Sequence, residues 1–93
     1  MASSDRGLRA MRKSIDGLDR GIVRLLAKRF ALAGRLAPLK RRVRAPQRER
    51  TVLAHVARCA REYGVEAAII RSVYRKLMSE SRRCQQRFRG AAR

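Results

Sequence analysis

The chain has 93 residues, of which 45% are hydrophobic and 4% aromatic, and its formal net charge at pH 7 is +18. This length allows one small domain with a modest core, and the hydrophobic fraction excludes a disordered chain. Few glycines and prolines, and no tryptophan, favour helix over sheet. The charge predicts an anionic partner, an enzyme with a basic surface, or a nucleic-acid binder.

Motifs for metal, covalent or membrane chemistry are not found in the sequence. Cys59 and Cys84 are isolated thiols without the spacing of a metal site. The first eleven residues have no apolar core of a signal peptide, and no run reaches membrane-spanning length. No glycine-rich phosphate loop or nucleophile motif occurs. We therefore expect a reduced, cytoplasmic protein that uses no metal and no cofactor.

Apolar residues recur every three or four positions over the first forty residues. They are Leu8, Met11, Ile15, Leu18, Ile22, Leu25, Leu32, Leu36 and Leu39. This seam resembles that of a coiled coil and predicts one long helix over about residues 6–41, with Pro38 kinking its last turn. Two shorter helices cannot cover so long a stripe, so we expect a homodimer.

Two further helices are predicted after the basic loop KRRVRAPQ. Pro46 suits a first helical turn, which places the second helix at about residues 46–62, and Gly64 is expected to cap its end. Its inward residues are Val52, Leu53, Val56 and Ala60. The third helix is predicted over about residues 66–88, with Ile70, Val73, Leu77 and Phe88 inward. Without any two-residue alternation, the fold class is all-α, one domain over 1–93 with flexible tails at 1–7 and 89–93.

Polar side chains interrupt the inward stripe of each predicted helix. They are Arg29 and Lys40 in the first, Glu49 in the second, and Ser81 and Gln85 in the third. At about 100° per residue, Arg29 and Lys40 share a face, about 16 Å apart along the axis, and long side chains there would bracket a small dianion. Arg12 points about 100° away from Arg29, which suits the site of an antiparallel partner chain.

A structural ion pair is the alternative explanation for these inward cations. A single inward arginine is more often paired with a structural carboxylate than bound to a ligand. Glu49 is the only acid on an inward stripe, so structural pairing cannot satisfy both Arg29 and Lys40. The combination therefore favours a binding site for a small anion.

The ordered motifs resemble those of the chorismate mutases of the all-helical AroQ class, over about residues 8–88. The set is I-D-x-L-D from Ile15, L-L-x-x-R ending at Arg29, Lys40 eleven residues later, P-x-R-E from Pro46 and S-x-x-x-Q from Ser81. The resemblance implies an intertwined homodimer of three-helix chains. It also implies an isomerase of aromatic amino acid biosynthesis (the shikimate pathway) that converts chorismate to prephenate.

The same resemblance implies a role for each site residue. Arg29, and Arg12 from the other subunit, would bind the two carboxylates of chorismate. Lys40 and Gln85 would donate hydrogen bonds to the ether oxygen of the breaking bond.

At the other end of the substrate, Glu49 would accept a hydrogen bond from the C4 hydroxyl. Arg48 and Ser81 would complete the site. The family often has an aspartate where this chain has Ala45, which leaves the C4 substituent open.

Three other functions stay open at this point. Isochorismate pyruvate lyases share A-P-x-R, as at 45–48, but tend to have an apolar residue where Glu49 stands. A mutase acting on 4-amino-4-deoxychorismate would fit the change at Ala45. A nucleic-acid-binding protein would fit the charge, but four aromatic residues offer little base stacking and no recognition motif is visible, so we do not expect a nucleic acid partner.

Overall fold

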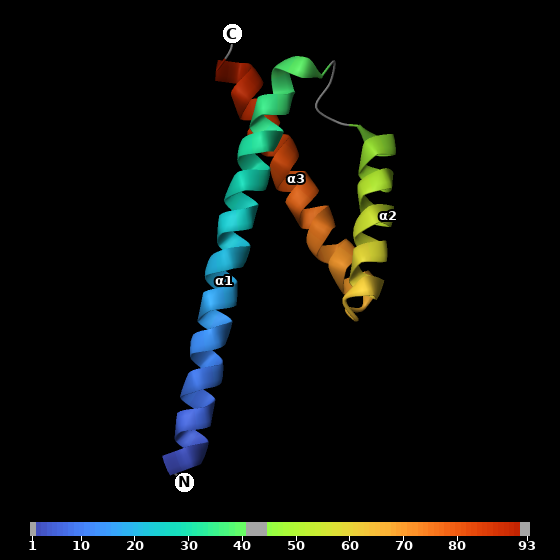
Figure 1. Ribbon diagram of the computed structural model, residues 1–93. Coiled ribbons are helices and arrows are strands. Elements are labelled where there is room, and N and C mark those ends of the chain that lie inside the picture. Colours follow the sequence, from blue (N-terminus) through green and yellow to red (C-terminus); the bar gives the residue numbers. More distant parts are fainter. Residues whose placement is uncertain (1, 41–44, 92–93) are drawn as a thin grey trace. The chain divides into compact units, whose positions relative to one another are not determined.

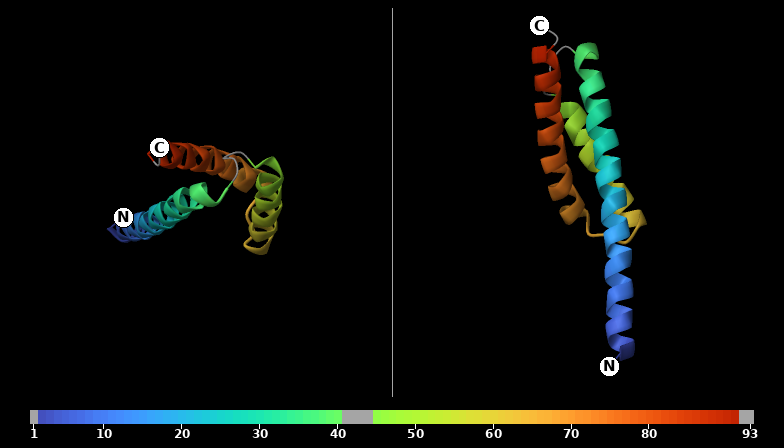
Figure 2. Two further views of the ribbon diagram at one scale, coloured as in Figure 1. Left: turned by 90° about the horizontal axis from the view of Figure 1, so that it is seen from above. Right: turned by 90° about the vertical axis from the view of Figure 1, so that its left-hand side faces the viewer.

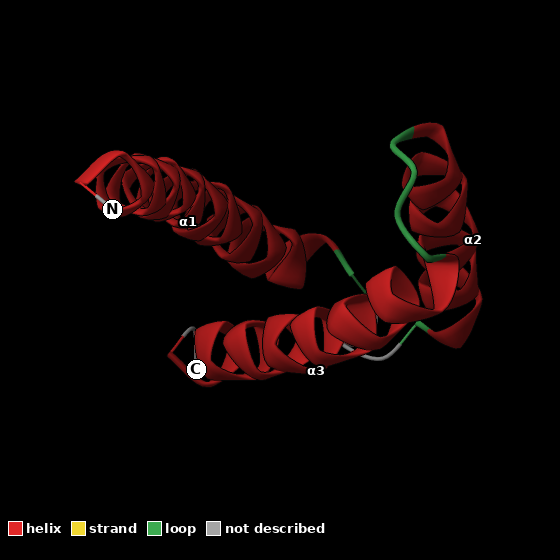
Figure 3. Ribbon diagram, turned by 90° about the horizontal axis from the view of Figure 1, so that it is seen from below, coloured by secondary structure: helices red, strands yellow, loops and turns green. Residues whose placement is uncertain are grey.

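The structure is a computed structural model that describes residues 2–40 and 45–91, with side chains described for 4–40 and 45–87. It contains α1 (Ala2–Leu36), the short 3-10 helix η1 (Ala37–Leu39), α2 (Pro46–Glu62) and α3 (Ala67–Ala91) (Figure 1). Within these ranges there is no strand (Figure 3), which confirms the predicted all-α fold with three helices. Residues 41–44 of the predicted basic loop lie outside the described residues.

The first helix starts and ends earlier than predicted. The α-helical part covers Ala2–Leu36 rather than about 6–41, and η1 follows it. Pro38 causes the early end because it has no N–H for the carbonyl four residues earlier, and its ring clashes with that carbonyl. Lys40 consequently lies beyond the helix in extended conformation, with φ −105° and ψ 144°. The tails predicted at 1–7 and 89–93 continue α1 and α3 as far as they are described, and their flexibility stays a prediction.

The chain divides into two compact units, residues 1–31 and residues 32–93. In the second unit α2 and α3 run antiparallel and are joined by a short turn (Figures 1 and 2). Gly64 makes this turn with φ 70°, and the N–H of Val65 donates to the carbonyl of Ala60 at 2.8 Å. The left-handed glycine closes the last turn of α2 and reverses the chain. Both the bounds of α2 and the cap at Gly64 are confirmed.

The second unit has a small core composed mainly of short side chains. Its buried apolar residues are Ala33, Ala37, Val56, Ala57, Ala60 and Met78. Of the residues predicted to face inward on α2, Val56 and Ala60 are buried, and Val52 and Leu53 are half-buried. The small core leaves room for polar groups on the same faces.

The buried stripe of α3 is displaced from the prediction. Its fully buried members, Met78, Ser81 and Gln85, follow one another at steps of three and four. Val73 is not inward as predicted but 50% exposed, because it lies about 110° around the helix from the middle of this stripe. Ile70 and Leu77 are half-buried, and the side chain of Phe88 lies outside the described residues.

The first unit is formed by α1 alone. The apolar residues of its predicted seam are exposed along the whole helix. Their exposed fractions lie between 48% for Leu8 and 69% for Met11, and Leu25 is 60% exposed. A single helix contains nothing against which to pack its own apolar face. None of the described helices is both long enough and apolar enough to cross a membrane.

Candidate active site

Two predicted site residues, 45 positions apart in the sequence, are hydrogen-bonded to each other. Lys40 Nζ donates to Gln85 Oε1 at 3.1 Å. Lys40 reaches Gln85 because η1 packs against α3, and the extended backbone after η1 carries the lysine onward. Since Oε1 accepts from the ammonium, the amide nitrogen Nε2 is the atom left to donate to a ligand.

Gln85 belongs to a buried polar stripe on α3. Gln85 is 5% exposed, and Ser81, one turn earlier on the same face, is 8% exposed. The Ser81 hydroxyl donates to the carbonyl of Leu77 at 2.9 Å. Buried polar groups are stable when they are hydrogen-bonded, and no buried side-chain nitrogen or oxygen in the described part of the chain lacks a partner. The stripe is therefore a fixed array of polar groups.

Glu49, the predicted acceptor, pairs with a residue that the sequence analysis did not identify. Arg82 Nη1 donates to Glu49 Oε2 at 2.5 Å, and the two side chains are 26% and 22% exposed. Glu49 lies in the first turn of α2, where the helix dipole favours a carboxylate. The inward acid is thus satisfied by Arg82 of α3, whereas Lys40 has an amide as its partner. With 25 basic and seven acidic residues, an arginine partner for any inward acid was to be expected.

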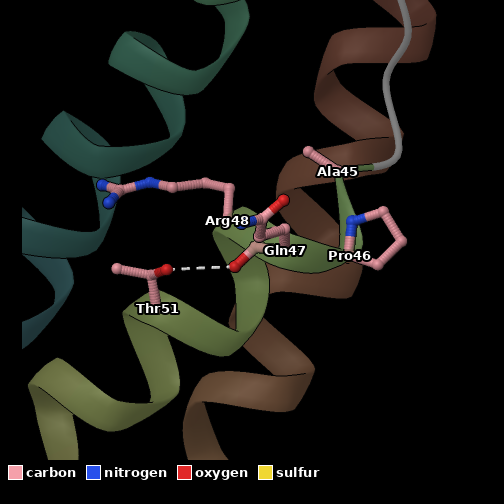
Figure 4. Close-up of a pocket in the computed structure, with 5 residues that line it drawn as sticks. All are labelled: Ala45, Pro46, Gln47, Arg48 and Thr51. Atoms are coloured by element: carbon pink, nitrogen blue, oxygen red, sulfur yellow. Dashed lines mark hydrogen bonds between the residues drawn. The ribbon is translucent and has the colours of Figure 1, made fainter.

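Arg48 lies on the exposed side of the N-terminus of α2. It lines an open cavity of about 440 Å³ together with Ala45, Pro46, Gln47 and Thr51. Figure 4 shows its side chain extending away from Ala45 and Pro46, while the hydroxyl of Thr51 donates to the carbonyl of Gln47 at 3.0 Å. Ala45 provides no side-chain cap for α2. The structure does not join Arg48 to the other predicted site residues by a hydrogen bond.

Arg12 and Arg29 both lie on α1 within the first unit. Arg12 is exposed and Arg29 is half-buried. Their separation of seventeen residues places them about 25 Å apart along the helix axis. One copy of α1 therefore cannot bring both guanidinium groups to a single small molecule.

The predicted face shared by Arg29 and Lys40 assumed an α-helix through residue 40. That assumption is wrong, because the α-helical hydrogen bonding ends at Leu36 and Lys40 follows η1 in extended conformation. The described residues contain no group of three or more side chains suited to holding a metal ion.

Comparison with known proteins agrees with the motifs. Residues 11–86 match the family model described as chorismate mutase type II. Similar proteins include the T-protein of Enterobacter agglomerans, 36% identical over 78 residues, and that of Haemophilus influenzae, 35% identical over 78 residues. Each match covers 80% of this chain and 21% of the relative, so the chain spans about a fifth of their length. Because the family model covers most of its length, this chain belongs to the chorismate mutase type II family.

Proposed function

We propose that this chain catalyses the rearrangement of chorismate to prephenate, with Lys40 and Gln85 acting at the ether oxygen. Membership of the chorismate mutase type II family supports the reaction. The observation that carries the assignment of residues is the hydrogen bond from Lys40 to the buried amide of Gln85. This hydrogen bond brings the Lys40 ammonium next to the side-chain amide of Gln85, whose oxygen accepts it.

The reaction suits such a pair of donors. One C–O bond breaks while one C–C bond forms within the same molecule, so no nucleophile and no proton transfer is needed. The protein has to hold the reacting conformer and stabilise the negative charge that grows on the ether oxygen. The Lys40 ammonium and the Gln85 Nε2 group would both donate to this oxygen, and their mutual bond fixes them before the substrate arrives.

The two carboxylates of chorismate need cations at a distance from the ether oxygen. We assign them to Arg29 and to Arg12 of a second copy of the chain, because one α1 spaces the two residues too widely. A guanidinium group binds a carboxylate through two parallel hydrogen bonds, which fixes orientation as well as charge. Arg48 and Ser81 would complete the site, and Glu49 would accept from the C4 hydroxyl.

A homodimer is part of this proposal. The exposed seam of α1 is a long apolar stripe of the kind that pairs with another helix. An antiparallel second copy would cover the seam and carry its Arg12 toward Arg29 of the first copy. A symmetric pair would then contain two equivalent sites.

The test is an absorbance assay of the purified chain with chorismate, isochorismate and 4-amino-4-deoxychorismate in parallel. We expect consumption of chorismate with formation of prephenate, and little or no pyruvate release from isochorismate. An absence of turnover with chorismate, from a folded dimeric preparation, would overturn the proposal. Preferred cleavage of isochorismate would assign the chain to the lyase reaction instead.

A further inference from the structure

The ion pair between Glu49 and Arg82 has no role in the chemistry described above. We propose that Arg82 is a positioning residue that determines specificity: it neutralises the Glu49 carboxylate, so that the site accepts a C4 hydroxyl and disfavours a C4 ammonium. The inference rests on the proposed function, because it takes Glu49 to face the C4 substituent.

The geometry of the pair leaves one carboxylate oxygen for the substrate. Arg82 Nη1 holds Oε2 of Glu49, so Oε1 is the atom available to accept a hydrogen bond. The pair joins α3 to α2, and both side chains are about three-quarters buried. Arg82 thus fixes the position of the carboxylate as well as balancing its charge. A neutral hydroxyl needs only a positioned lone pair and no net negative charge.

The surroundings of the pair are positively charged. Glu49 and Arg82 line a cavity of about 340 Å³ that Arg50 and Arg75 also line. Three guanidinium groups and one carboxylate give this lining a net charge of +2. Ala45, at the N-terminus of the same helix, supplies no second carboxylate. The aliphatic amine of 4-amino-4-deoxychorismate is an ammonium at neutral pH, and these cations oppose its approach.

The alternative is that Arg82 only ties the two helices together. In that case its removal would lower the amount of folded enzyme, or loosen the site, equally for both substrates. The ratio of kcat/KM for chorismate to that for 4-amino-4-deoxychorismate separates the two explanations, because the folded fraction cancels from it. Removing a cation near the C4 substituent must move this ratio toward the amino substrate.

The experiment measures this ratio for the wild type, Arg82→Met and Arg82→Lys. Arg83→Met is the matched control, because Arg83 is the next residue of α3 and pairs with the carboxylate of Glu80 instead of Glu49. We expect the wild type to prefer chorismate and Arg82→Met to shift the ratio about tenfold toward the amino substrate. Arg82→Lys should recover most of the preference, and Arg83→Met should match the wild type. If Arg82→Met does not fold, Arg82→Gln removes the charge while keeping a hydrogen-bond donor for Glu49.

Several outcomes would contradict the inference. One is an unchanged ratio in the uncharged variants. Another is a shift in Arg82→Lys as large as that in Arg82→Met, and a third is a wild-type preference for the amino substrate. Failure of the proposed function gives a different result, since the wild type would then show no turnover of chorismate at all.

Discussion

The α2–α3 hairpin and the first unit satisfy their side chains in different ways. In the second unit, which contains this hairpin, apolar and polar groups find partners: Val56 and Met78 are buried, and Lys40, just after η1, donates to Gln85 of α3. In residues 1–31, a single helix exposes an apolar seam, with Ile22 54% exposed. Both regions are helices of similar amphipathic pattern, so amphipathicity alone does not tell whether a helix packs within its own chain.

This difference between the two units suggests how the proposed site residues are divided between them. The donors proposed for the ether oxygen lie in the unit that has a core of its own, whereas the arginines proposed for the carboxylates lie on the helix whose apolar seam is exposed. Assembly would then control substrate binding more than the arrangement of the donors.

The largest effect should come from a charge in the seam. Ile22→Glu would place a carboxylate in the apolar seam, and a symmetric dimer would contain this change twice. We expect it to weaken dimerisation by about a thousandfold and to abolish activity at micromolar concentration. Light scattering and the chorismate assay measure the two effects. Arg20→Gln is the control, because it changes the charge equally at an exposed position off the seam. A fully active monomer would refute the proposed division.

Removal of an arginine that binds a substrate carboxylate should lower activity somewhat less. Arg29→Ala should lower kcat/KM about a hundredfold, since one charge-assisted bidentate contact in a dry site is worth on the order of 3 kcal/mol. The helical circular dichroism should stay unchanged. Lys28→Ala removes one charge from the neighbouring exposed position and should stay close to the wild type. Near-normal activity of Arg29→Ala would exclude Arg29 from the site.

The donor role of Gln85 should show itself as a pH dependence. Gln85→Glu replaces the Nε2 donor by a carboxylate oxygen that repels the growing oxyanion, so activity at pH 7.5 should fall at least about tenfold. Protonation restores a donor, and activity relative to the wild type should rise toward pH 5, although Lys40 beside the carboxylate opposes that protonation.

Gln86→Glu makes the same charge change at the adjacent exposed position and serves as the control. A ratio of mutant to wild-type activity that is flat with pH, in a folded dimer, would count against Gln85 as the donor.

The smallest effect concerns the half-buried carboxylate of Glu80 on α3. A hydrogen bond from Lys76, together with the charge of Arg83, holds the pKa of Glu80 below its ordinary value of 4.5. A lowered folded pKa contributes stability above pH 4.5 that is lost as the pH falls through the folded value. Glu80→Gln should therefore lower Tm at pH 7 by at most about 2 °C, and the difference should shrink as the pH falls below 4.5.

Glu62→Gln is the control for this measurement. It makes the same charge change in the last turn of α2, where a carboxylate opposes the helix dipole, so it should not lower Tm. A Tm difference for Glu80→Gln that stays unchanged as the carboxylate is titrated below pH 4.5 would show that the ion pairs are not its cause.

Local rules predicted some elements well and others badly. The bounds of α2 followed from Pro46 at its first turn and Gly64 after its last, which act on the backbone directly. The end of α1 was misplaced because apolar periodicity continues through Leu39, although Pro38 had already interrupted the hydrogen bonding. Apolar periodicity indicates which face of a helix a residue occupies. The backbone can leave the α-helical conformation while the apolar pattern in the sequence continues.

The site was predicted as a set of residue types, and the contacts between them were not. Lys40 and Gln85 were expected near the same substrate oxygen, but sequence spacing gave no sign of their mutual hydrogen bond. Arg82 was not predicted as a site residue, because it lies next to the buried stripe rather than in it. Its long side chain reaches Glu49 from that position. Partners of long polar side chains depend on how helices pack, which one-dimensional patterns do not encode.

The backbone conformation of Gly64 determines which mirror-image form of an amino acid could replace it. It is exposed, and a Cβ built on it would meet nothing within 4 Å, so its φ of 70° is the obstacle to replacement by an L-residue. A D-amino acid has mirror-image torsional preferences and favours this φ. In a chemically synthesised chain, a D-alanine in place of Gly64 would stabilise the hairpin by about 0.4–1 kcal/mol, because the unfolded chain would lose freedom that glycine allows. The chirality that opposes L-alanine at this turn would favour its enantiomer.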